Sequence, residues 1–213
     1  MFITIEGIEG SGKSTNATFI MQHLSNLGIK ALHTREPGGT LIAEQIRAIF
    51  LDKALKETIT AQTELLLLFA ARSQHLENLI IPALNADNYV VCERFTDASF
   101  AYQGGGRNVD LKYISFLENF VQRGLSPDLI VLFDVDVSIA LNRIKARGST
   151  DRIEEEKADF FERVRKVYLE RARSDPKKYY VINANLDLAK VRQQITDMLL
   201  KTINVSETCI QKR

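Results

Sequence analysis

The chain has 213 residues, of which 45% are hydrophobic and 26% charged, a composition typical of globular proteins rather than disordered or fibrous ones. Its 28 lysines and arginines nearly balance 27 aspartates and glutamates, and the net charge of +1 excludes strong attraction of the whole molecule to nucleic acid or anionic membranes. Two cysteines are too few for a disulfide framework or a four-cysteine zinc site, so we expect a cytoplasmic protein. The longest apolar run, residues 65–71, is far shorter than the roughly 20 residues of a membrane span.

Short β-like runs alternate with longer helical runs along the chain. The pattern predicts strands at residues 2–6, 30–35, 89–92, 129–133 and 179–182. It predicts helices at residues 13–27, 41–51, 61–86, 110–123, 137–146 and 188–203. Such alternation is typical of a parallel sheet covered by helices on both faces. We therefore predict one doubly wound α/β domain over residues 1–204, followed by a polar C-terminal tail at 205–213.

Residues 7–14 match the phosphate-binding loop pattern GxxxxGK[ST], and they lie between a predicted strand and a predicted helix. The glycines let the backbone wrap around phosphates, while exposed N–H groups and the helix N-terminus attract negative charge. Lys13 is expected to reach the β and γ phosphates, and the Ser14 hydroxyl to bind Mg²⁺. Contacts with ATP are predicted for Gly7, Ile8, Glu9, Gly10, Ser11, Gly12, Lys13, Ser14 and Thr15.

The loop alone does not identify the reaction, because GTPase switches, ATPase motors and small-molecule kinases share it. The DxxG and NKxD strings of a GTP-binding domain do not occur in the sequence. Two reactions therefore remain as predictions: transfer of a phosphoryl group to an acceptor, and hydrolysis of ATP.

Three polar segments follow predicted strands, where ligands of a doubly wound sheet bind. They are residues 34–40, 93–97 and 134–136. The second continues through Ser99, Tyr102 and Gln103 into three glycines and Arg107, and the glycines indicate either close approach of another group or flexibility. An aromatic ring, an amide and an arginine suit the recognition of a base and a phosphate. Two arginines on predicted helices, Arg47 and Arg72, could bind phosphate in the same cleft.

A basic flap is predicted at about residues 143–155, where Arg143, Arg147 and Arg152 flank a hinge-like break between two helices. Over the phosphates, such a flap would exclude water and stabilise charge during phosphoryl transfer. A solvated helical face is the alternative, because acidic and basic residues mix from residue 143 to residue 173.

Together these segments resemble the thymidylate kinase family, which phosphorylates dTMP to dTDP with ATP. The resemblance rests on the phosphate loop and on the strings TREPGG, FAAR, ERF, AYQGGGR and RG followed by DR. The sequence is similar to the bacterial type, with its extra arginines in the flap and Glu9 inside the loop. The resemblance implies a nucleoside monophosphate kinase-like fold, ATP and dTMP as substrates, Mg²⁺, a homodimer and a place in dTTP synthesis, with no nucleic-acid or membrane partner.

The resemblance also implies roles for single residues. Glu9 would accept the deoxyribose 3′-hydroxyl, while Arg47 and Arg94 would hold the dTMP phosphate. Arg72 and Gln103 would contact the thymine, and Tyr102 would crowd a ribose 2′-hydroxyl. Substrate contacts are expected from Glu9, Glu36, Pro37, Arg47, Phe69, Arg72, Arg94, Ser99, Tyr102 and Gln103. Arg143, Arg147 and Arg152 would close over ATP, and the catalytic set is Lys13, Arg94, Glu9, Arg147 and Arg152.

Two positions depart from the family pattern. Glu93 replaces the usual aspartate, so the metal contacts are expected from Ser14 and Glu93, with Asp134 as a second candidate. Leu68 stands where an aromatic ring commonly stacks on thymine, so either Phe69 supplies the ring or Leu68 an apolar floor. The three histidines, His23, His33 and His75, lack metal-ligand spacing, and we expect surface or core positions for them.

Two alternative functions remain from the sequence. Another nucleotide or nucleoside kinase, such as one acting on thymidine, is possible, although several arginines fit a phosphorylated acceptor better. A nucleotide-dependent switch or regulatory ATPase is the alternative from another class. The apolar helix at 61–86 could form the dimer interface or part of the core.

Overall fold

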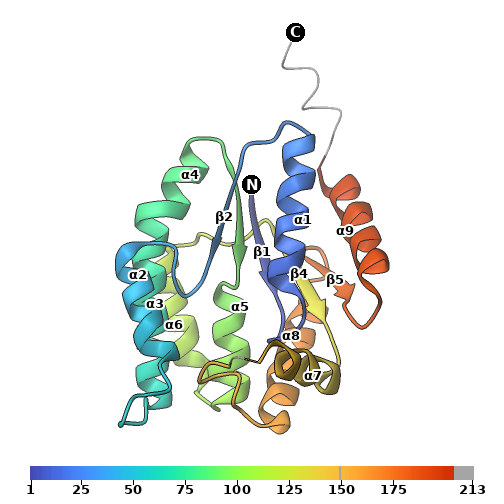
Figure 1. Ribbon diagram of the computed structural model, residues 1–213. Helices are drawn as coiled ribbons and strands as arrows, with labels where there is room; N and C mark the ends of the chain where they lie inside the picture. Colours follow the sequence, from blue (N-terminus) through green and yellow to red (C-terminus); the bar gives the residue numbers. More distant parts are fainter. Residues whose placement is uncertain (149, 204–213) are drawn as a thin grey trace.

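Five parallel strands form one sheet in the order β2-β3-β1-β4-β5 in the computed structural model, which describes residues 1–148 and 150–203 (Figure 1). The strands are β1 (Phe2–Glu6), β2 (Ala31–Arg35), β3 (Tyr89–Glu93), β4 (Leu129–Asp134) and β5 (Tyr179–Asn183). In the central strand, Ile3 pairs with Val91 of β3 and with Leu129 of β4. The predicted parallel α/β fold is thus confirmed, with the strand carrying the phosphate loop at its centre.

Helices surround this sheet. The α-helices are α1 (Lys13–Asn26), α2 (Leu41–Leu51), α3 (Ala61–His75), α4 (Ile81–Asn85), α5 (Thr96–Ser99), α6 (Leu111–Gln122), α7 (Val137–Arg147), α8 (Ala158–Ser174) and α9 (Leu188–Thr202), and two π-helical segments are η1 (Leu76–Ile80) and η2 (Phe100–Gly106). Threonine side chains fix two helix starts, since Thr40 accepts a hydrogen bond from the Ala43 N–H and Thr60 from the Thr63 N–H. Within the described residues, no helix is both long and apolar enough to cross a bilayer.

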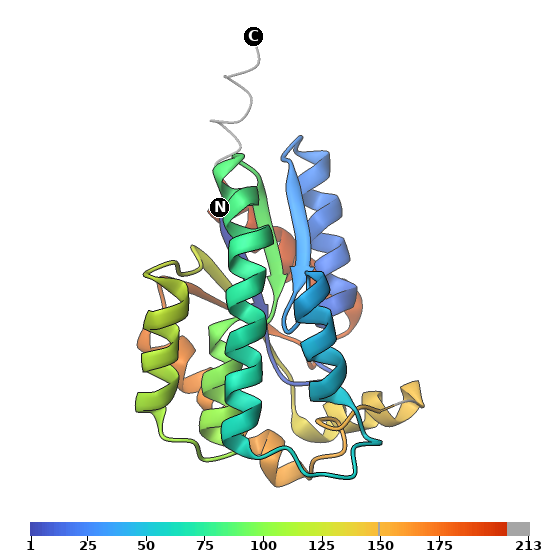
Figure 2. The same ribbon diagram turned by 90° about the vertical axis from the view of Figure 1, so that its left-hand side faces the viewer.

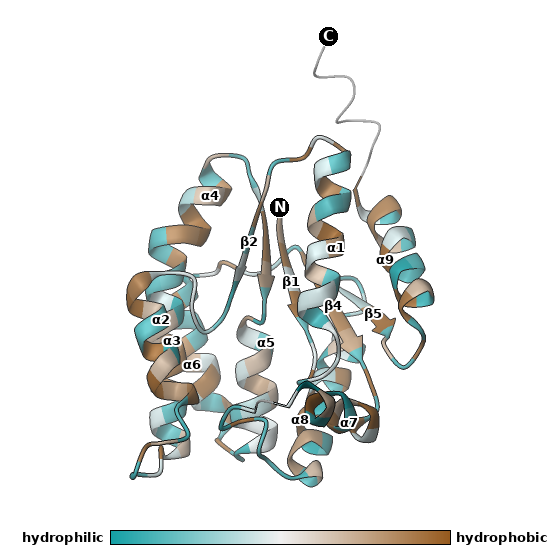
Figure 3. Ribbon diagram, in the orientation of Figure 1, coloured by the Kyte–Doolittle hydropathy of each residue, from teal (hydrophilic) through white to brown (hydrophobic). Residues whose placement is uncertain are grey.

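The core lies on both faces of the sheet because successive strand residues point in opposite directions. Ile3 and Ile5 belong to one apolar cluster with Leu24 of α1 and Ile195 of α9. Phe2 belongs to another, with residues of β3 and η1. Figure 3 shows the central strands in brown between helices of mixed colour. Burial of each such side chain stabilises the fold by about 1.5–3 kcal/mol, so the sheet is a rigid base for the loops at its carboxyl edge.

The helical run predicted at 61–86 is helical throughout, but it contains a π-helical segment between α3 and α4. Figure 2 shows α3, η1 and α4 as one continuous column. Pro82 occupies the first turn of α4. Because proline cannot donate a hydrogen bond and its ring crowds the carbonyl four residues earlier, a wider turn before it keeps the helix unbroken.

Residues 96–106, for which no element was predicted, form α5 and η2. The triple glycine lies where η2 packs against α8. A Cβ atom on Gly105 would lie 2.6 Å from Cγ2 of Val167, and one on Gly106 would lie 2.4 Å from Cε2 of Phe160. Of the two reasons considered for the glycines, close approach is therefore the one that the packing supports.

The predicted flap, at about 143–155, corresponds to the end of α7 and the turns at 152–155 that precede α8. Helix α7 ends at Gly148 in the left-handed conformation, with φ of 85°. Ser149 of the predicted flap lies outside the described residues, and so does the whole predicted tail at 205–213.

Candidate active site

A cavity of about 430 Å³ opens at the carboxyl edge of the sheet, beside the phosphate loop. Most predicted site residues line it: Glu9, Gly10, Gly12, Lys13, Ser14, Thr15, Glu36, Pro37, Arg47, Arg72, Glu93, Arg94, Ser99, Tyr102, Gln103, Arg143 and Arg147. Five predicted residues are not among its lining: Gly7, Ile8, Ser11, Phe69 and Arg152. Segments from six parts of the chain, residues 9 to 154, thus meet in one place.

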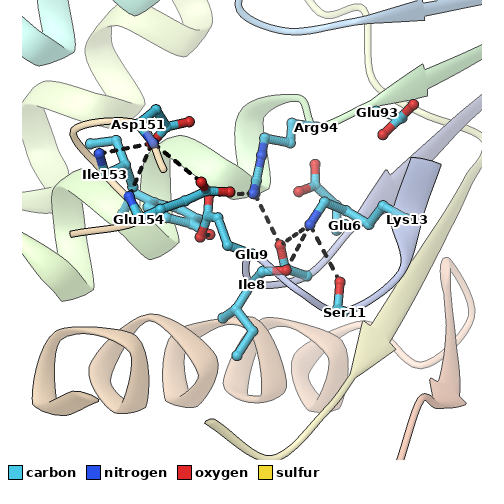
Figure 4. Close-up of polar contacts among 12 residues, drawn as sticks. Glu6, Ile8, Glu9, Ser11, Lys13, Glu93, Arg94, Asp151, Ile153 and Glu154 are labelled. Carbon is cyan, nitrogen blue, oxygen red and sulfur yellow. Dashed lines mark hydrogen bonds and ion pairs between the residues drawn. The ribbon is translucent and has the colours of Figure 1, made fainter. Parts of the chain in front are cut away.

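The phosphate loop wraps tightly around the Lys13 side chain. Lys13 Nζ donates to the carbonyl oxygens of Gly7 at 3.0 Å and Ile8 at 2.7 Å and to Ser11 Oγ at 3.3 Å (Figure 4). The loop is packed so closely on α7 that a Cβ atom on Gly10 would lie 2.4 Å from the Ala140 carbonyl oxygen. Burial, together with the charge of Arg94, lowers the pKa of Lys13 to about 7. An anion in the loop would therefore bind more tightly when this amine is protonated, and its binding would raise the pKa of Lys13.

Arg94 follows β3 and joins the phosphate loop to the acceptor side of the cavity. Its backbone is in the left-handed region, with φ of 66°. The guanidinium donates from Nη2 to Glu9 Oε1 at 2.6 Å and from Nη1 to the Gly7 carbonyl at 2.9 Å, and it lies over the Tyr102 ring at 4.9 Å. Burial acts to lower the pKa of Arg94, but Glu9 and the surrounding groups raise it well above its usual value. The cation is thus permanent and held in a fixed orientation.

Glu9 has a second partner, because the Tyr102 hydroxyl donates to its other carboxylate oxygen. Glu9, Arg94 and Tyr102 therefore form one cluster on the cavity wall. Burial raises the pKa of Tyr102 well above its ordinary value, so the phenol remains a hydrogen-bond donor.

Arg72 and Gln103 are buried side chains that contribute polar atoms to the site. Arg72 Nε donates to Glu36 Oε2 at 2.7 Å, and its Nη2 donates to the Phe95 carbonyl at 3.0 Å and to Ser99 Oγ at 3.1 Å. Arg72 Nη1 and Gln103 Oε1 are buried and have no hydrogen-bond partner among the described protein atoms. Since buried polar groups are normally paired, one donor and one acceptor are available to a ligand here.

Arg47 and Arg143 bracket the cavity from α2 and α7. Arg47 Nη1 donates to the Pro37 carbonyl at 2.9 Å, and burial lowers the pKa of this arginine. Arg143 Nη1 donates to the Gly10 carbonyl of the phosphate loop at 3.2 Å, and its Nη2 donates to the Ala184 carbonyl at 3.1 Å. Arg47 thus lies beside the segment predicted to hold the acceptor, and Arg143 beside the segment predicted to hold ATP.

Glu93 lies next to Ser14, as the predicted metal pair requires. Ser14 Oγ donates to Glu93 Oε2 at 2.6 Å, and His33 Nε2 lies 3.0 Å from Glu93 Oε1. Burial acts to raise the pKa of Glu93, but the hydrogen bonds from His33 and Ser14 outweigh it and the pKa is lowered. The other candidate, Asp134, accepts two hydrogen bonds from Arg165, at 2.7 Å and 3.0 Å. The geometry therefore favours Glu93 over Asp134 as the carboxylate beside the phosphate loop.

Two of the three flap arginines, Arg143 and Arg147, line the cavity, and the third, Arg152, is not among its lining residues. Arg147 lines the cavity and donates to Glu154. Arg152 instead donates from Nη1 to the buried Glu64 at 2.7 Å and from Nε to the Phe50 carbonyl at 2.9 Å. Arg152 thus anchors the flap to α2 and α3.

Two acidic residues of the flap that were not among the predicted site residues, Asp151 and Glu154, also line the cavity. Asp151 Oδ1 accepts from the N–H groups of Ile153 at 2.9 Å and Glu154 at 3.0 Å, which fixes a tight turn. Figure 4 shows this turn approaching Glu9 and Arg94 from the side opposite Lys13. Burial raises the pKa of Asp151, and the carboxylates of Glu154 and Glu9 raise it further. In the sequence these residues belong to the mixed charges of the flap, and the signals available for them were the DR string at 151–152 and an Asx-turn spacing.

Leu68 and Phe69, the two candidates for apolar contact with the base, lie in different surroundings. Leu68 lines the cavity. Phe69 is 2% exposed and packs with Leu65, Phe100 and Ile114 in a separate apolar cluster. Arg72 lies over the Phe69 ring at 4.6 Å, so Phe69 supports a site residue from behind.

Comparison with known proteins gives one consistent result. The thymidylate kinase family model matches residues 5–195. The chain is similar to a thymidylate kinase of Ectopseudomonas mendocina, at 50% identity over 199 residues that cover 93% of this chain and 94% of the relative. It is 49% identical to a thymidylate kinase of Neisseria meningitidis over 198 residues, 93% of this chain and 95% of the relative.

A solved structure agrees with these relatives. The crystal structure of thymidylate kinase from Ehrlichia chaffeensis is similar with a TM-score of 0.75 at 33% identity, over 93% of this chain and 97% of that one. The match therefore extends over the sheet, the phosphate loop and the cavity. From its sequence and its fold alike, the chain belongs to the thymidylate kinase family.

Proposed function

We propose that the cavity is where the γ-phosphoryl group of ATP is transferred to dTMP, giving dTDP for dTTP synthesis. The observation that carries this proposal is the position of Arg94, which donates to Gly7 and Glu9 of a complete phosphate loop and lies over the ring of Tyr102 on the acceptor side. The arginines on both sides suit two phosphorylated substrates, and neither a nucleoside kinase nor a switch ATPase needs them all.

In this mechanism the chain acts by positioning and by stabilising charge. Lys13 and the N–H groups of the loop hold the phosphates of ATP, while Arg47 and Arg94 hold the dTMP phosphate. Arg94 lies between the two, where the transferred group gathers negative charge in the transition state. Arg143 and Arg147 cover the ATP side. Phosphoryl transfer of this loose type makes little demand on a general base.

Mg²⁺ fits the oxygen ligands that the chain offers. The Ser14 hydroxyl and the Glu93 carboxylate, 2.6 Å apart, are hard oxygen donors at the end of the phosphate loop. In our proposal these two groups hold the ion directly or through water. When bound, Mg²⁺ neutralises phosphate charge and orients the γ-phosphoryl group.

The base and the sugar are recognised by buried side chains. Arg72 Nη1 would donate to a carbonyl oxygen of thymine, and Gln103 Oε1 would accept from its ring N–H, so both unpaired atoms find partners. Leu68 provides an apolar wall, and Ser99 extends the polar edge. Glu9 would accept the 3′-hydroxyl, while the Tyr102 ring limits space for a 2′-hydroxyl. This recognition favours deoxynucleotides with a uracil-type base.

We also propose a homodimer formed through α3 and α6. Helix α6 exposes Tyr113, Phe116 and Phe120 at 54%, 66% and 70%, and the neighbouring α3 exposes Leu66 at 58%. Figure 3 shows the hydrophobic colour of α6. Exposed apolar patches of this kind mark protein interfaces. Light scattering should give about twice the 24.1 kDa chain mass, and Phe120→Glu should halve it; a wild-type mass of one chain would contradict the dimer.

The proposed reaction is tested by the release of ADP from ATP with Mg²⁺ and dTMP, dUMP, UMP, AMP, thymidine or no acceptor, with products identified by mass. We expect turnover that strongly prefers dTMP and yields dTDP, in keeping with a cytoplasmic enzyme of nucleotide supply. ADP release that ignores the acceptor would favour the ATPase alternative, and turnover of thymidine but not dTMP would favour a nucleoside kinase.

A further inference from the structure

His75 is a fully buried histidine at the end of α3, and neither the phosphate loop nor the flap uses it. Its Nδ1 lies 3.2 Å from Glu36 Oε1, and its Nε2 lies 2.7 Å from Thr34 Oγ1. An ionised carboxylate only accepts hydrogen bonds, so Nδ1 carries the proton and donates to Glu36. In the neutral ring Nε2 then accepts from the Thr34 hydroxyl, which fixes both the tautomer and the plane of the imidazole.

Glu36 passes this orientation on to the cavity. Its other oxygen, Oε2, accepts from Arg72 Nε at 2.7 Å. The four residues Thr34, His75, Glu36 and Arg72 form one continuous row of side chains, with exposures of 8%, 0%, 5% and 2%. Glu36 and Arg72 line the cavity, whereas Thr34 and His75 are not among its lining residues, and the buried Nη1 of Arg72 has no partner among the described protein atoms.

The backbone after β2 leaves room for this histidine. A Cβ atom on Gly39 would lie 2.4 Å from His75 Nε2 and 2.6 Å from Thr34 Oγ1. Any residue other than glycine would therefore displace the ring from between its two partners. The segment from Thr34 to Gly39 supplies the hydroxyl, the carboxylate and the space that the imidazole needs, all from a stretch far from α3 in the sequence.

We propose that His75 is a positioning residue for base selection. By holding Glu36 it holds the guanidinium of Arg72, which can donate a hydrogen bond but cannot accept one. The site therefore accepts a pyrimidine with a carbonyl oxygen at C4. In dCMP an amino group takes that place, so a hydrogen-bond donor of the base would face the donor Nη1 of Arg72 and neither would be paired. Unpaired buried polar groups give strong discrimination, but only while the guanidinium is held in place. This inference rests on the proposed contact of Arg72 with the base.

The test compares three variants, His75→Leu, His75→Asn and His75→Gln, by kcat and KM for dTMP and dCMP, KM for ATP and the melting temperature. The amide nitrogen of asparagine can occupy the place of Nδ1 and donate to Glu36, whereas that of glutamine reaches the place of Nε2. We expect His75→Leu and His75→Gln to raise KM for dTMP about tenfold, with little change in kcat or in KM for ATP. The preference for dTMP over dCMP in kcat/KM should fall by a similar factor, and His75→Asn should retain most of it.

Three results would overturn the inference. If His75→Leu lowers only the melting temperature and leaves the dTMP to dCMP preference intact, the ring merely fills space. If His75→Leu does not fold, equal preferences in the asparagine and glutamine variants would exclude positioning through Glu36. If the wild-type protein does not phosphorylate dTMP, the proposed function itself fails, an outcome visible before any variant is compared.

Discussion

Replacement of Arg94 by methionine separates what its guanidinium does in catalysis from what it does in the fold. Arg94 donates to two residues of the phosphate loop, Glu9 at 2.6 Å and the Gly7 carbonyl at 2.9 Å, and it lies over the Tyr102 ring on the acceptor side. Methionine retains an unbranched apolar side chain but no donor and no charge. Removal of one preorganised donor to transition-state charge typically costs a factor of about 10²–10³ in kcat, and an arginine at a transferred phosphoryl group contributes up to about 10³–10⁵. We therefore expect kcat for dTMP to fall at least about 100-fold.

The same substitution also affects stability, since it leaves the Glu9 carboxylate with the Tyr102 hydroxyl but without its cation. Loss of one partner of a fully buried ion pair costs about 3–5 kcal/mol. The Arg94 and Glu9 side chains are still 18% and 12% exposed, so some hydration returns and we expect about 2 kcal/mol. Glu9→Gln in the same chain removes the unpaired charge and should restore most of this loss.

The assay measures ADP release at saturating ATP and dTMP alongside urea unfolding, for the wild type, the Arg94→Met variant and the double variant with Glu9→Gln. Stability should recover in the double variant and kcat should not. Retention of kcat within tenfold in the single variant would remove Arg94 from the catalytic residues. Recovery of kcat together with stability would mean that Arg94 acts only through the fold.

Three further predictions concern protons and packing. Because the pKa of Lys13 is about 7 and an anion raises it, ATP binding at pH 8 should take up close to one more proton than at pH 6, measured by calorimetry in two buffers, and Lys13→Arg should abolish the difference. Burial and Asp97 raise the pKa of Glu6 from 4.5 to about 7, so between these pH values the folded protein holds a proton that the unfolded chain has lost. The free energy of unfolding should therefore fall as pH rises from about 4.5 to 7, and Glu6→Gln should flatten this slope. Gly106→Ala should destabilise the protein by about 1–3 kcal/mol in thermal unfolding, and Phe160→Leu should relieve part of that, whereas a neutral Gly106→Ala would contradict the packing of η2 on α8.

The fold was predictable because its information is local. Most strands and helices were predicted from their own apolar patterns, and the alternation of the two defines a parallel sheet, but α8 was not among the predicted helices. The π-helical segments η1 and η2 were not predicted, since a π turn has no apolar period of its own. The sequence left two explanations open for the triple glycine, because a glycine does not show which residues will pack against it. The positions of Phe160 and Val167 on α8 show that the glycines make room for a neighbouring helix.

The candidate site was predictable where a motif names a residue, and less so where a partner decides its position. Arg94 and most of the phosphate loop line the cavity. Arg152 is an arginine of the same flap as Arg147, but it does not line the cavity. Its partner Glu64 lies 88 residues away in the sequence, on α3. Likewise nothing near His75 in the sequence indicates that it lies between Thr34 and Glu36. Long-range pairing of this kind is a property of the tertiary structure.

These pairings also explain how a cavity lined with arginines occurs in a chain whose net charge is only +1. Arg94 pairs with Glu9, Arg72 with Glu36 and Arg147 with Glu154. Each carboxylate offsets part of the attraction that a phosphate would feel, so the pairing lowers long-range affinity. In return it fixes the guanidinium plane through some of its five N–H groups, and in Arg72 it leaves Nη1 for a ligand. For a reaction catalysed by positioning, the fixed geometry is worth more than the lost attraction, because only interactions that strengthen in the transition state raise kcat.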